Sequence, residues 1–291
     1  MIKKMDKHER AFLAILTPVL LLFFFFNTFL LLQGFRYSFT NFRGFGSFEW
    51  VGLRNYVDLF TDSRIWKSYR FTLFFAVVCS VVVNALSLLL ALALNAKIKA
   101  KTALRGVYFL PNVLGGLIVA YVFNFLFTFI LPALGKAIGS STLSTSLLSS
   151  PNTAWIAVVI VCSWSSVAIN TIIYISGLQT VPEEVYEAGS IDGANGFTRF
   201  RALTFPLILP FVTINMVLCM KNFLMVFDQI VALTKGGPAQ STEAISFLIY
   251  TNGIGGNQFG FQSANAFIFF ILIVTVSIIQ MQAMNKKEEQ L

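Results

Sequence analysis

The chain has 291 residues, of which 56% are hydrophobic and 12% are charged. Soluble domains carry about a quarter charged residues, so the composition excludes an ordinary soluble protein and indicates an integral membrane protein. The net charge of +8 does not indicate nucleic-acid binding, because basic residues flank the apolar stretches and no basic run is interleaved with aromatic residues in a polar segment.

Six apolar stretches are long enough to cross about 30 Å of hydrocarbon. The first follows a basic segment, but it is longer than a signal-peptide core and no small-residue cleavage pattern follows it. We therefore expect a retained anchor helix and an all-α membrane domain over residues 11–284, between tails at 1–10 and 285–291. The six expected transmembrane helices are 11–34, 70–95, 106–130, 153–178, 204–230 and 263–284.

The distribution of basic residues predicts the orientation of these spans. Lys and Arg gather in the N-terminal tail, in residues 97–105 and at Lys286 and Lys287, and such residues favour the cytoplasmic side. With six spans these segments share one side, so both termini of this multi-pass cell-membrane protein are expected in the cytoplasm. The outside segment 36–70 also carries six basic residues against three acids, but it is longer and the opposing signals are more numerous.

Two further expectations concern the outside loops and the cysteines. Within the outside segment 231–262, residues 243–250 are expected to form a short surface helix. The cysteines lie inside apolar stretches without metal-ligand spacing, and the one histidine, His8, lies in the N-terminal tail. We expect buried free thiols, no metal and no cofactor. The three cysteines are Cys79, Cys162 and Cys219.

The segment EEVYEAGSIDGANGFTRFRALTFPLILP, residues 183–210, is charged and glycine-broken between two apolar stretches. Thr180 and Glu183 have the spacing of a capping box, which predicts a helix to about Ser190. Gly193 then permits a sharp reversal, and a second helix is expected after Gly196. An ordinary polar loop is the alternative, but two short helices joined at glycine are typical of a knob that docks into another protein.

This segment resembles the EAA loop of ABC-type import permeases. Glu187, Ala188, Gly193 and Pro206 match that pattern. Three positions depart from it, and the departure at Gly189 is expected to loosen the first helix by up to about 1 kcal/mol relative to alanine. The three departures are Gly189, Leu203 and Phe205.

Two other stretches extend the resemblance over nearly the whole chain. LTKGGPAQST, residues 233–242, and RGVYFLPNV, residues 105–113, are similar to stretches of sugar permeases. The chain resembles the first permease of oligosaccharide importers of the maltose, glycerol-phosphate and multiple-sugar (raffinose) group. That resemblance implies a type I ABC importer permease fold with six spans and a cytoplasmic coupling helix within residues 180–206.

The resemblance also implies a set of partners. These are a second, homologous permease, two copies of a cytoplasmic ATP-binding subunit, an extracellular solute-binding protein, an oligosaccharide substrate and the surrounding membrane lipid. The chain itself is expected to be non-catalytic, because it contains no G-x-x-x-x-G-K-[ST] phosphate loop. The residues expected to couple it to the ATPase are Glu187, Ala188, Ile191, Asp192, Gly193, Phe197 and Pro206.

Polar residues inside spans are costly and so indicate a substrate pathway. They gather in the two spans that flank the charged segment, and resemblance to the maltose-type permease implies that these stretches line a sugar site. Hydrogen bonds between spans are the alternative role for each residue. Lys221 and Asp228, seven residues apart, are expected two turns apart on one helix face. The candidate substrate residues are Trp164, Ser165, Ser166, Asn170, Cys219, Asn222 and Asp228.

Two other functions remain open from the residues alone. A proton-coupled secondary sugar carrier would also have six or more spans, but it needs several membrane-embedded ionisable groups, and only Lys221 and Asp228 fall within expected spans. An ABC importer of another polar solute is the second alternative. Charged solutes favour a cluster of Arg or Lys in the spans, which is absent, so a neutral saccharide is the expected substrate.

Overall fold

The computed structural model describes residues 6–95, 106, 112 and 114–288. These residues divide into two compact units. The smaller unit consists of the described residues within Met1–Asp62 and Ile249–Phe270, and the larger of those within Ser63–Leu248 and Ile271–Leu291. The basic loop predicted at 97–105 lies outside the described residues.

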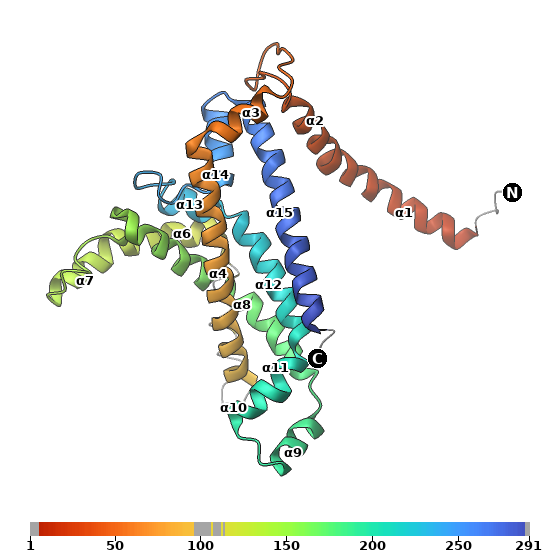
Figure 1. The fold of residues 1–291 in the computed structure, drawn as a ribbon, viewed down its shortest axis with the longest axis vertical. Coiled ribbons are helices and arrows are strands. Elements are labelled where there is room, and N and C mark those ends of the chain that lie inside the picture. The colour runs from red at the N-terminus through yellow and green to blue at the C-terminus, as the bar shows by residue number, and fades with distance from the viewer. Residues whose placement is uncertain (1–5, 96–105, 107–111, 113, 289–291) are drawn as a thin grey trace. The chain divides into compact units, whose positions relative to one another are not determined.

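The larger unit is built on three packed helices, α4 (Ser63–Asn95), α8 (Pro151–Gln179) and α12 (Leu209–Leu224). Figure 1 shows α4 and α8 running along the unit, with α12 beside them. Two shorter helices, α6 (Gly116–Phe125) and α13 (Asp228–Leu233), pack against each other. The core between these helices is apolar and excludes solvent, with buried Phe75, Val83, Val158, Leu224 and Ile230.

Within the described residues, five helices are long and apolar enough to cross a membrane, and a bent pair makes a sixth candidate. The all-helical fold with five to six spans confirms the predicted class. The second and fourth predicted spans agree with α4 and α8 to within a few residues at most ends, whereas α4 begins seven residues earlier than predicted. The five helices are Phe12–Tyr37, Ser63–Asn95, Gly116–Ala137, Pro151–Gln179 and Phe259–Lys286.

The third span differs from the prediction at its outer end. The helix continues from α6 through a π-helical turn, η2 (Leu126–Ile130), into α7 (Leu131–Ala137), seven residues beyond the predicted end. Pro132 does not stop it, because proline is tolerated at the start of a helical segment and Pro132 lies at the beginning of α7. Most of the predicted beginning, residues 106–113, lies outside the described residues.

The fifth span was predicted as one helix over 204–230, and this prediction was wrong in two places. The run Gly196–Leu207, made of α10 (Gly196–Arg199), η4 (Phe200–Thr204) and α11 (Phe205–Leu207), meets α12 at a bend of 71°. Proline removes a backbone donor, and Pro206 and Pro210 flank this bend at Ile208. A second break separates α12 from α13 at residues 225–227. Contrary to the prediction, Lys221 and Asp228 therefore do not share one helix face.

The predicted surface helix at 243–250 was also wrong. Helix α14 (Ile245–Tyr250) exists, but Glu243, Ile245 and Leu248 are buried. The backbone N–H of Ile245 donates to the Thr72 hydroxyl at 3.0 Å. The Arg64 guanidinium donates to both carboxylate oxygens of Glu243, at 2.9 and 2.6 Å, so an ion pair anchors the start of this segment to α4.

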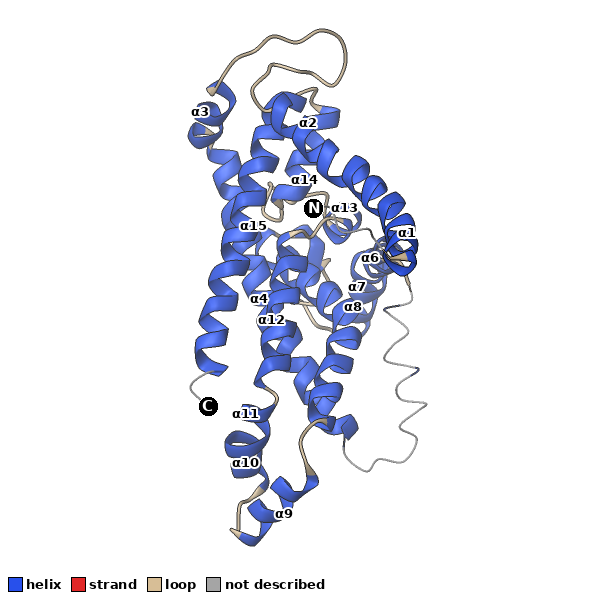
Figure 2. Cartoon of the chain, turned by 90° about the vertical axis from the view of Figure 1, so that its right-hand side faces the viewer, coloured by secondary structure: helices blue, strands red, loops and turns tan. Residues whose placement is uncertain are grey.

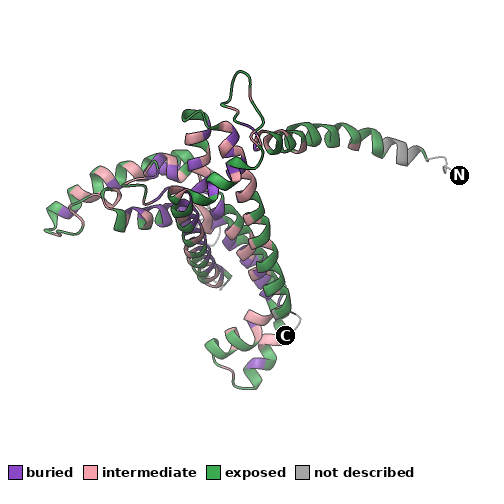
Figure 3. Ribbon diagram, turned by 45° about the horizontal axis from the view of Figure 1, so that its top comes forward, coloured by how far each residue is buried: buried purple, intermediate pink, exposed green. Residues whose placement is uncertain are grey.

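The smaller unit contains the N-terminal helical run of α1 (Lys7–Phe23), η1 (Phe24–Phe29) and α2 (Leu30–Tyr37), the short helix α3 (Arg54–Thr61), η5 (Thr251–Gly255) and the first part of α15 (Phe259–Glu288). The most apolar part of the N-terminal run has no buried residue, and Figure 3 shows most of the described residues of this run as exposed. The described part of the chain thus leaves this span free for contact with lipid or another subunit.

Candidate functional site

The charged segment folds as two short helices around a glycine turn. Helix α9 (Glu183–Ile191) begins after Pro182. Glu183 and Glu184 lie in its first turn, where negative charges interact favourably with the helix dipole. The predicted capping box is wrong: the Thr180 hydroxyl donates to the Gly177 carbonyl at 2.8 Å and so belongs to the end of α8. Figures 1 and 2 show α9 and α10 beyond the ends of α8 and α12.

Helix α9 ends at Ile191, one residue beyond the predicted end, and Gly193 makes the predicted reversal in a Schellman motif. The N–H of Ala194 donates to the Gly189 carbonyl at 2.9 Å, and that of Gly193 donates to the Ser190 carbonyl at 3.2 Å. Gly193 has a φ of +74°, a left-handed conformation that costs other residues about 1–2 kcal/mol. The side chain of Asn195 then caps α10 by accepting from the N–H of Thr198 at 2.8 Å.

The two helices pack closely because of Gly189. A β-carbon at this position would lie 2.6 Å from Cδ1 of Leu203, so alanine at this position requires Leu203 to move. Two polar contacts accompany this packing: Arg199 donates to the Ser190 hydroxyl at 3.3 Å, and Thr204 donates to the Tyr186 hydroxyl at 3.3 Å. The expectation that Gly189 loosens the first helix considered helix propensity alone. It left out the close packing of Gly189 against Leu203, which a larger side chain at position 189 would obstruct.

The tip of the segment presents apolar side chains without cover from the described chain. Ile191 is 86% exposed and Phe197 is 72% exposed. Glu187, Ala188 and Asp192 are exposed beside them, whereas Pro206 is half-buried where the run approaches α12. Large apolar side chains are thus exposed on both helices that flank the Gly193 turn, which an ordinary solvated loop does not require.

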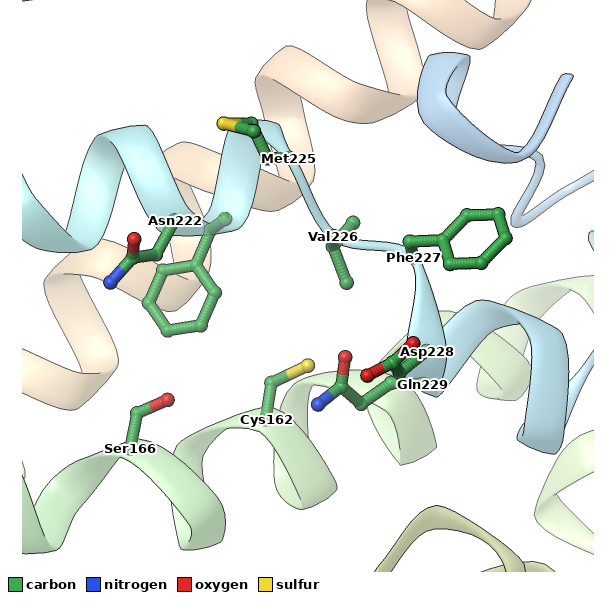
Figure 4. A pocket seen from close by; sticks show the side chains of 9 residues that line it. Cys162, Ser166, Asn222, Met225, Val226, Phe227, Asp228 and Gln229 are labelled. Carbon is green, nitrogen blue, oxygen red and sulfur yellow. The ribbon is translucent and has the colours of Figure 1, made fainter. Parts of the chain in front are cut away.

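A polar cavity of about 240 Å³ lies in the larger unit. Figure 4 shows Cys162 and Ser166 pointing from α8 toward Asn222 of α12 and the side chains of Asp228 and Gln229. Its polar groups are hydroxyl, amide and carboxylate, which form hydrogen bonds with hydroxyl groups. The lining residues are Cys162, Ser166, Asn222, Phe223, Met225, Val226, Phe227, Asp228 and Gln229.

The break between α12 and α13 builds one wall of this cavity. It frees the backbone carbonyl of Val226, which accepts a hydrogen bond from the Ser246 hydroxyl. The first turn of α6 lies close to the Asp228 and Gln229 side chains. A β-carbon on Gly116 would lie 3.2 Å from Nε2 of Gln229 and 3.5 Å from Oδ2 of Asp228. Gly116 therefore leaves just enough room for these two side chains.

The structure brings together three of the seven predicted substrate residues, since Ser166, Asn222 and Asp228 line the cavity. Cys219 and Asn170 instead contact each other across α12 and α8, with the thiol 3.2 Å from Oδ1 of the asparagine. Both side chains are buried. The hydrogen bond between spans that the sequence left open as an alternative is thus present for these two residues.

Trp164 and Ser165 lie on other faces of α8. The indole ring of Trp164 packs edge-on against Phe123 of α6, with ring centroids 5.2 Å apart. The hydroxyl of Ser165 donates to the Val161 carbonyl one turn earlier, at 2.9 Å. Neither residue lines the cavity described above.

Among the lining residues with a thiol or an amide side chain, sequence reasoning missed Cys162 and Gln229. Cys162 precedes Ser166 by one helical turn, so periodicity on α8 was a sufficient signal for it. Gln229 follows the break at 225–227, and no periodic pattern predicts its direction from the residues of α12.

The arrangement of these helices matches that of a solved membrane protein. The chain has the type I ABC importer permease fold, because it matches a crystal structure of a bacterial ABC transporter involved in the import of the acidic polysaccharide alginate. That match has a TM-score of 0.85 and covers 96% of each chain, at 19% sequence identity. At this low sequence identity, the match establishes the fold and nothing more.

Sequence comparison gives the family. Residues 84–289 match the family model for the binding-protein-dependent transport system inner membrane component, and the chain belongs to that family as a multi-pass inner-membrane permease. It is 41% identical to the multiple sugar-binding transport system permease protein MsmF of Streptococcus mutans, over 94% of each chain. It is 34% identical to the probable starch degradation products transport system permease protein AmyD of Thermoanaerobacterium thermosulfurigenes, over 89% of this chain and 88% of the relative.

Proposed function

We propose that this chain forms half of the translocation pathway of an ATP-driven importer of neutral oligosaccharides. A second, homologous permease supplies the other half, two ATP-binding subunits drive the cycle, and an extracellular solute-binding protein delivers the sugar. The single observation that carries the proposal is the uncovered apolar tip at Ile191 and Phe197. Such a tip on a rigid helix–turn–helix fits a groove in a partner.

In this proposal ATP-driven closure of the ATPase pair moves residues 180–206, and Glu187 makes the charged contact. The exposed acids Glu187 and Asp192 border the apolar tip, so a groove with an apolar floor and basic edges complements it. Because this segment faces the ATPase, both termini lie in the cytoplasm.

The cavity supports a neutral sugar as the transported solute. No Lys or Arg occurs among the described residues that line it, and the carboxylate of Asp228 repels anions while accepting hydrogen bonds from hydroxyl groups. Ser166 and Asn222 supply a hydroxyl and an amide on the opposite side. The sugar-related names of the two relatives support the same class of substrate.

The docking role is tested with two isoleucines that are both exposed. Ile191→Asp places a charge in the apolar tip, whereas Ile138→Asp changes an isoleucine that is 69% exposed beyond the end of α7. We expect the ATPase to be lost from the purified complex only with Ile191→Asp. Equal recovery of the ATPase with both variants contradicts the proposal.

The substrate class is tested by uptake. Cells with and without this gene are given labelled neutral mono- to tetrasaccharides and, for comparison, an acidic oligosaccharide. The proposal requires gene-dependent uptake of a neutral saccharide. Gene-dependent uptake of the acidic oligosaccharide alone contradicts it.

A further inference from the structure

Helix α3 carries an exposed stripe of large apolar side chains. Leu53, Val57 and Phe60 are 65%, 61% and 54% exposed, and their spacing of four and three residues places them on one helix face. The opposite face holds Asn55 and Leu59, which are buried. One face of α3 is therefore buried against the described chain, whereas the large apolar side chains of the other face are mostly exposed.

A polar face lies between these two sides. Arg54 and Asp58 are four residues apart and form an ion pair of 3.7 Å, with side chains 77% and 57% exposed. Trp50, three residues before the stripe, is 63% exposed. The segment thus offers apolar and charged groups side by side, as helices at a membrane–water interface do.

The buried face of α3 is tied to the end of the first span. The Asn55 amide donates to the carbonyls of Ser38 and Thr40, at 2.7 and 2.9 Å. The hydroxyl of Tyr56 lies 2.7 Å from that of Ser38. The first candidate span ends at Tyr37, so α3 is held within one turn of the point where that span leaves the hydrocarbon.

The residues that hold α3, 38–42, also contact the beginning of the last span. The N–H of Gly260 donates to the Phe42 carbonyl at 2.7 Å, and Phe42 packs against Phe259 with ring centroids 5.5 Å apart. A β-carbon on Gly260 would collide with the Thr40 carbonyl oxygen. One candidate span ends at Tyr37 and another begins at Phe259, both beside residues 38–42, so we place the boundary between hydrocarbon and water at this level of the smaller unit.

We propose that α3 lies in the membrane–water interface, with Leu53, Val57 and Phe60 immersed in lipid; that this interface is the extracytoplasmic one rests on the orientation given under the proposed function. The stripe then continues the lipid-facing surface of the spans to which α3 is attached. The Arg54–Asp58 pair points to the headgroups and water, and Trp50 takes the interfacial position that tryptophan favours. A docked protein that covered the apolar stripe would also cover much of the Arg54–Asp58 ion pair beside it. A membrane surface can instead take up the apolar stripe and leave the ion pair in water.

The test compares two adjacent positions with similar exposure. Val57→Cys and Asp58→Cys are each spin-labelled in the assembled transporter, reconstituted in vesicles of phosphatidylethanolamine and phosphatidylglycerol. The native cysteines are buried, so they are not expected to react. If unmodified protein takes up label, the measurement is repeated with all three cysteines replaced by alanine. Loss of the exposed 54–58 ion pair has little effect on folding.

Collisions with oxygen and with a water-soluble nickel complex report the environment of each label. We expect the label at position 57 to collide with oxygen and not with nickel, and the label at position 58 to collide with nickel. Equal nickel accessibility at both positions overturns the proposal, because the stripe then lies in water. Shielding of position 57 from both reagents also overturns it, because a protein then covers the stripe.

Discussion

The ion pair between Arg64 and Glu243 is the feature whose removal has the most clearly defined consequence. The Glu243 side chain is only 4% exposed, whereas that of Arg64 is 40% exposed. Removing one partner of a buried pair costs about 3–5 kcal/mol, because the other charge is left in a medium of low polarity. We expect Arg64→Met to lower the free energy of unfolding by about 3 kcal/mol, the lower end, because water reaches the exposed side of this pair.

The assay is unfolding of the purified protein in mixed micelles with increasing SDS. Arg54→Met is the matched control, because Arg54 also pairs with an acid but is 77% exposed, and such pairs contribute less than about 1 kcal/mol. The double variant Arg64→Met with Glu243→Met removes the buried charge and is expected to recover most of the loss. If Arg64→Met costs no more than Arg54→Met, the reasoning about the buried carboxylate is refuted.

Three further predictions concern transport. Gly193→Asp is expected to leave the permease in the membrane but to lower the sugar transported per ATP hydrolysed, because it strains the turn at the docking tip; wild-type transport would contradict this. Asp228→Ala should lower uptake without lowering membrane abundance, and unchanged uptake counts against a role in the cavity. Gly116→Ala is expected to raise the KM for the sugar by up to about tenfold, since one added methyl group disturbs a fitted site by that order. Gly115→Ala is its control, because a β-carbon there meets only Ile118, at 4.0 Å, and an equal rise in KM for both variants would exclude crowding of Asp228.

Apolar length was sufficient to predict which segments become helices, because a backbone in hydrocarbon must satisfy its own hydrogen bonds. It was insufficient to predict where a helix breaks. The break at 225–227 depends on the Ser246 hydroxyl, twenty residues away, which satisfies the Val226 carbonyl. The burial of Glu243 and Ile245 likewise depends on Arg64 and Thr72 of α4, which no local pattern connects with them.

The same distinction applies to the candidate sites. The turn at Gly193 follows from glycine's access to positive φ, so it was predictable locally. The division of the polar residues was not, because Ser166 and Asn170 lie on one face of α8, yet Ser166 lines the cavity and Asn170 is buried between helices. The two residues differ only in where α12 contacts α8: α12 covers Asn170 and leaves Ser166 open to the cavity.

That division suggests how the tip and the cavity are joined. On α8 the face that carries Ser166 continues through Asn170 to Tyr174 in steps of four, toward the charged segment. Asn170 is bonded to α12 through Cys219, and the Tyr174 hydroxyl donates to Oδ1 of Asn84 on α4 at 2.6 Å. Each such bond between spans contributes on the order of 0.6 kcal/mol, but together they tie three helices at the level between the cavity and residues 180–206. In the proposed function, a displacement of that segment by the ATPase would be passed to the cavity wall by packed helices that move as one body, and the cavity would need no contact of its own with the ATPase.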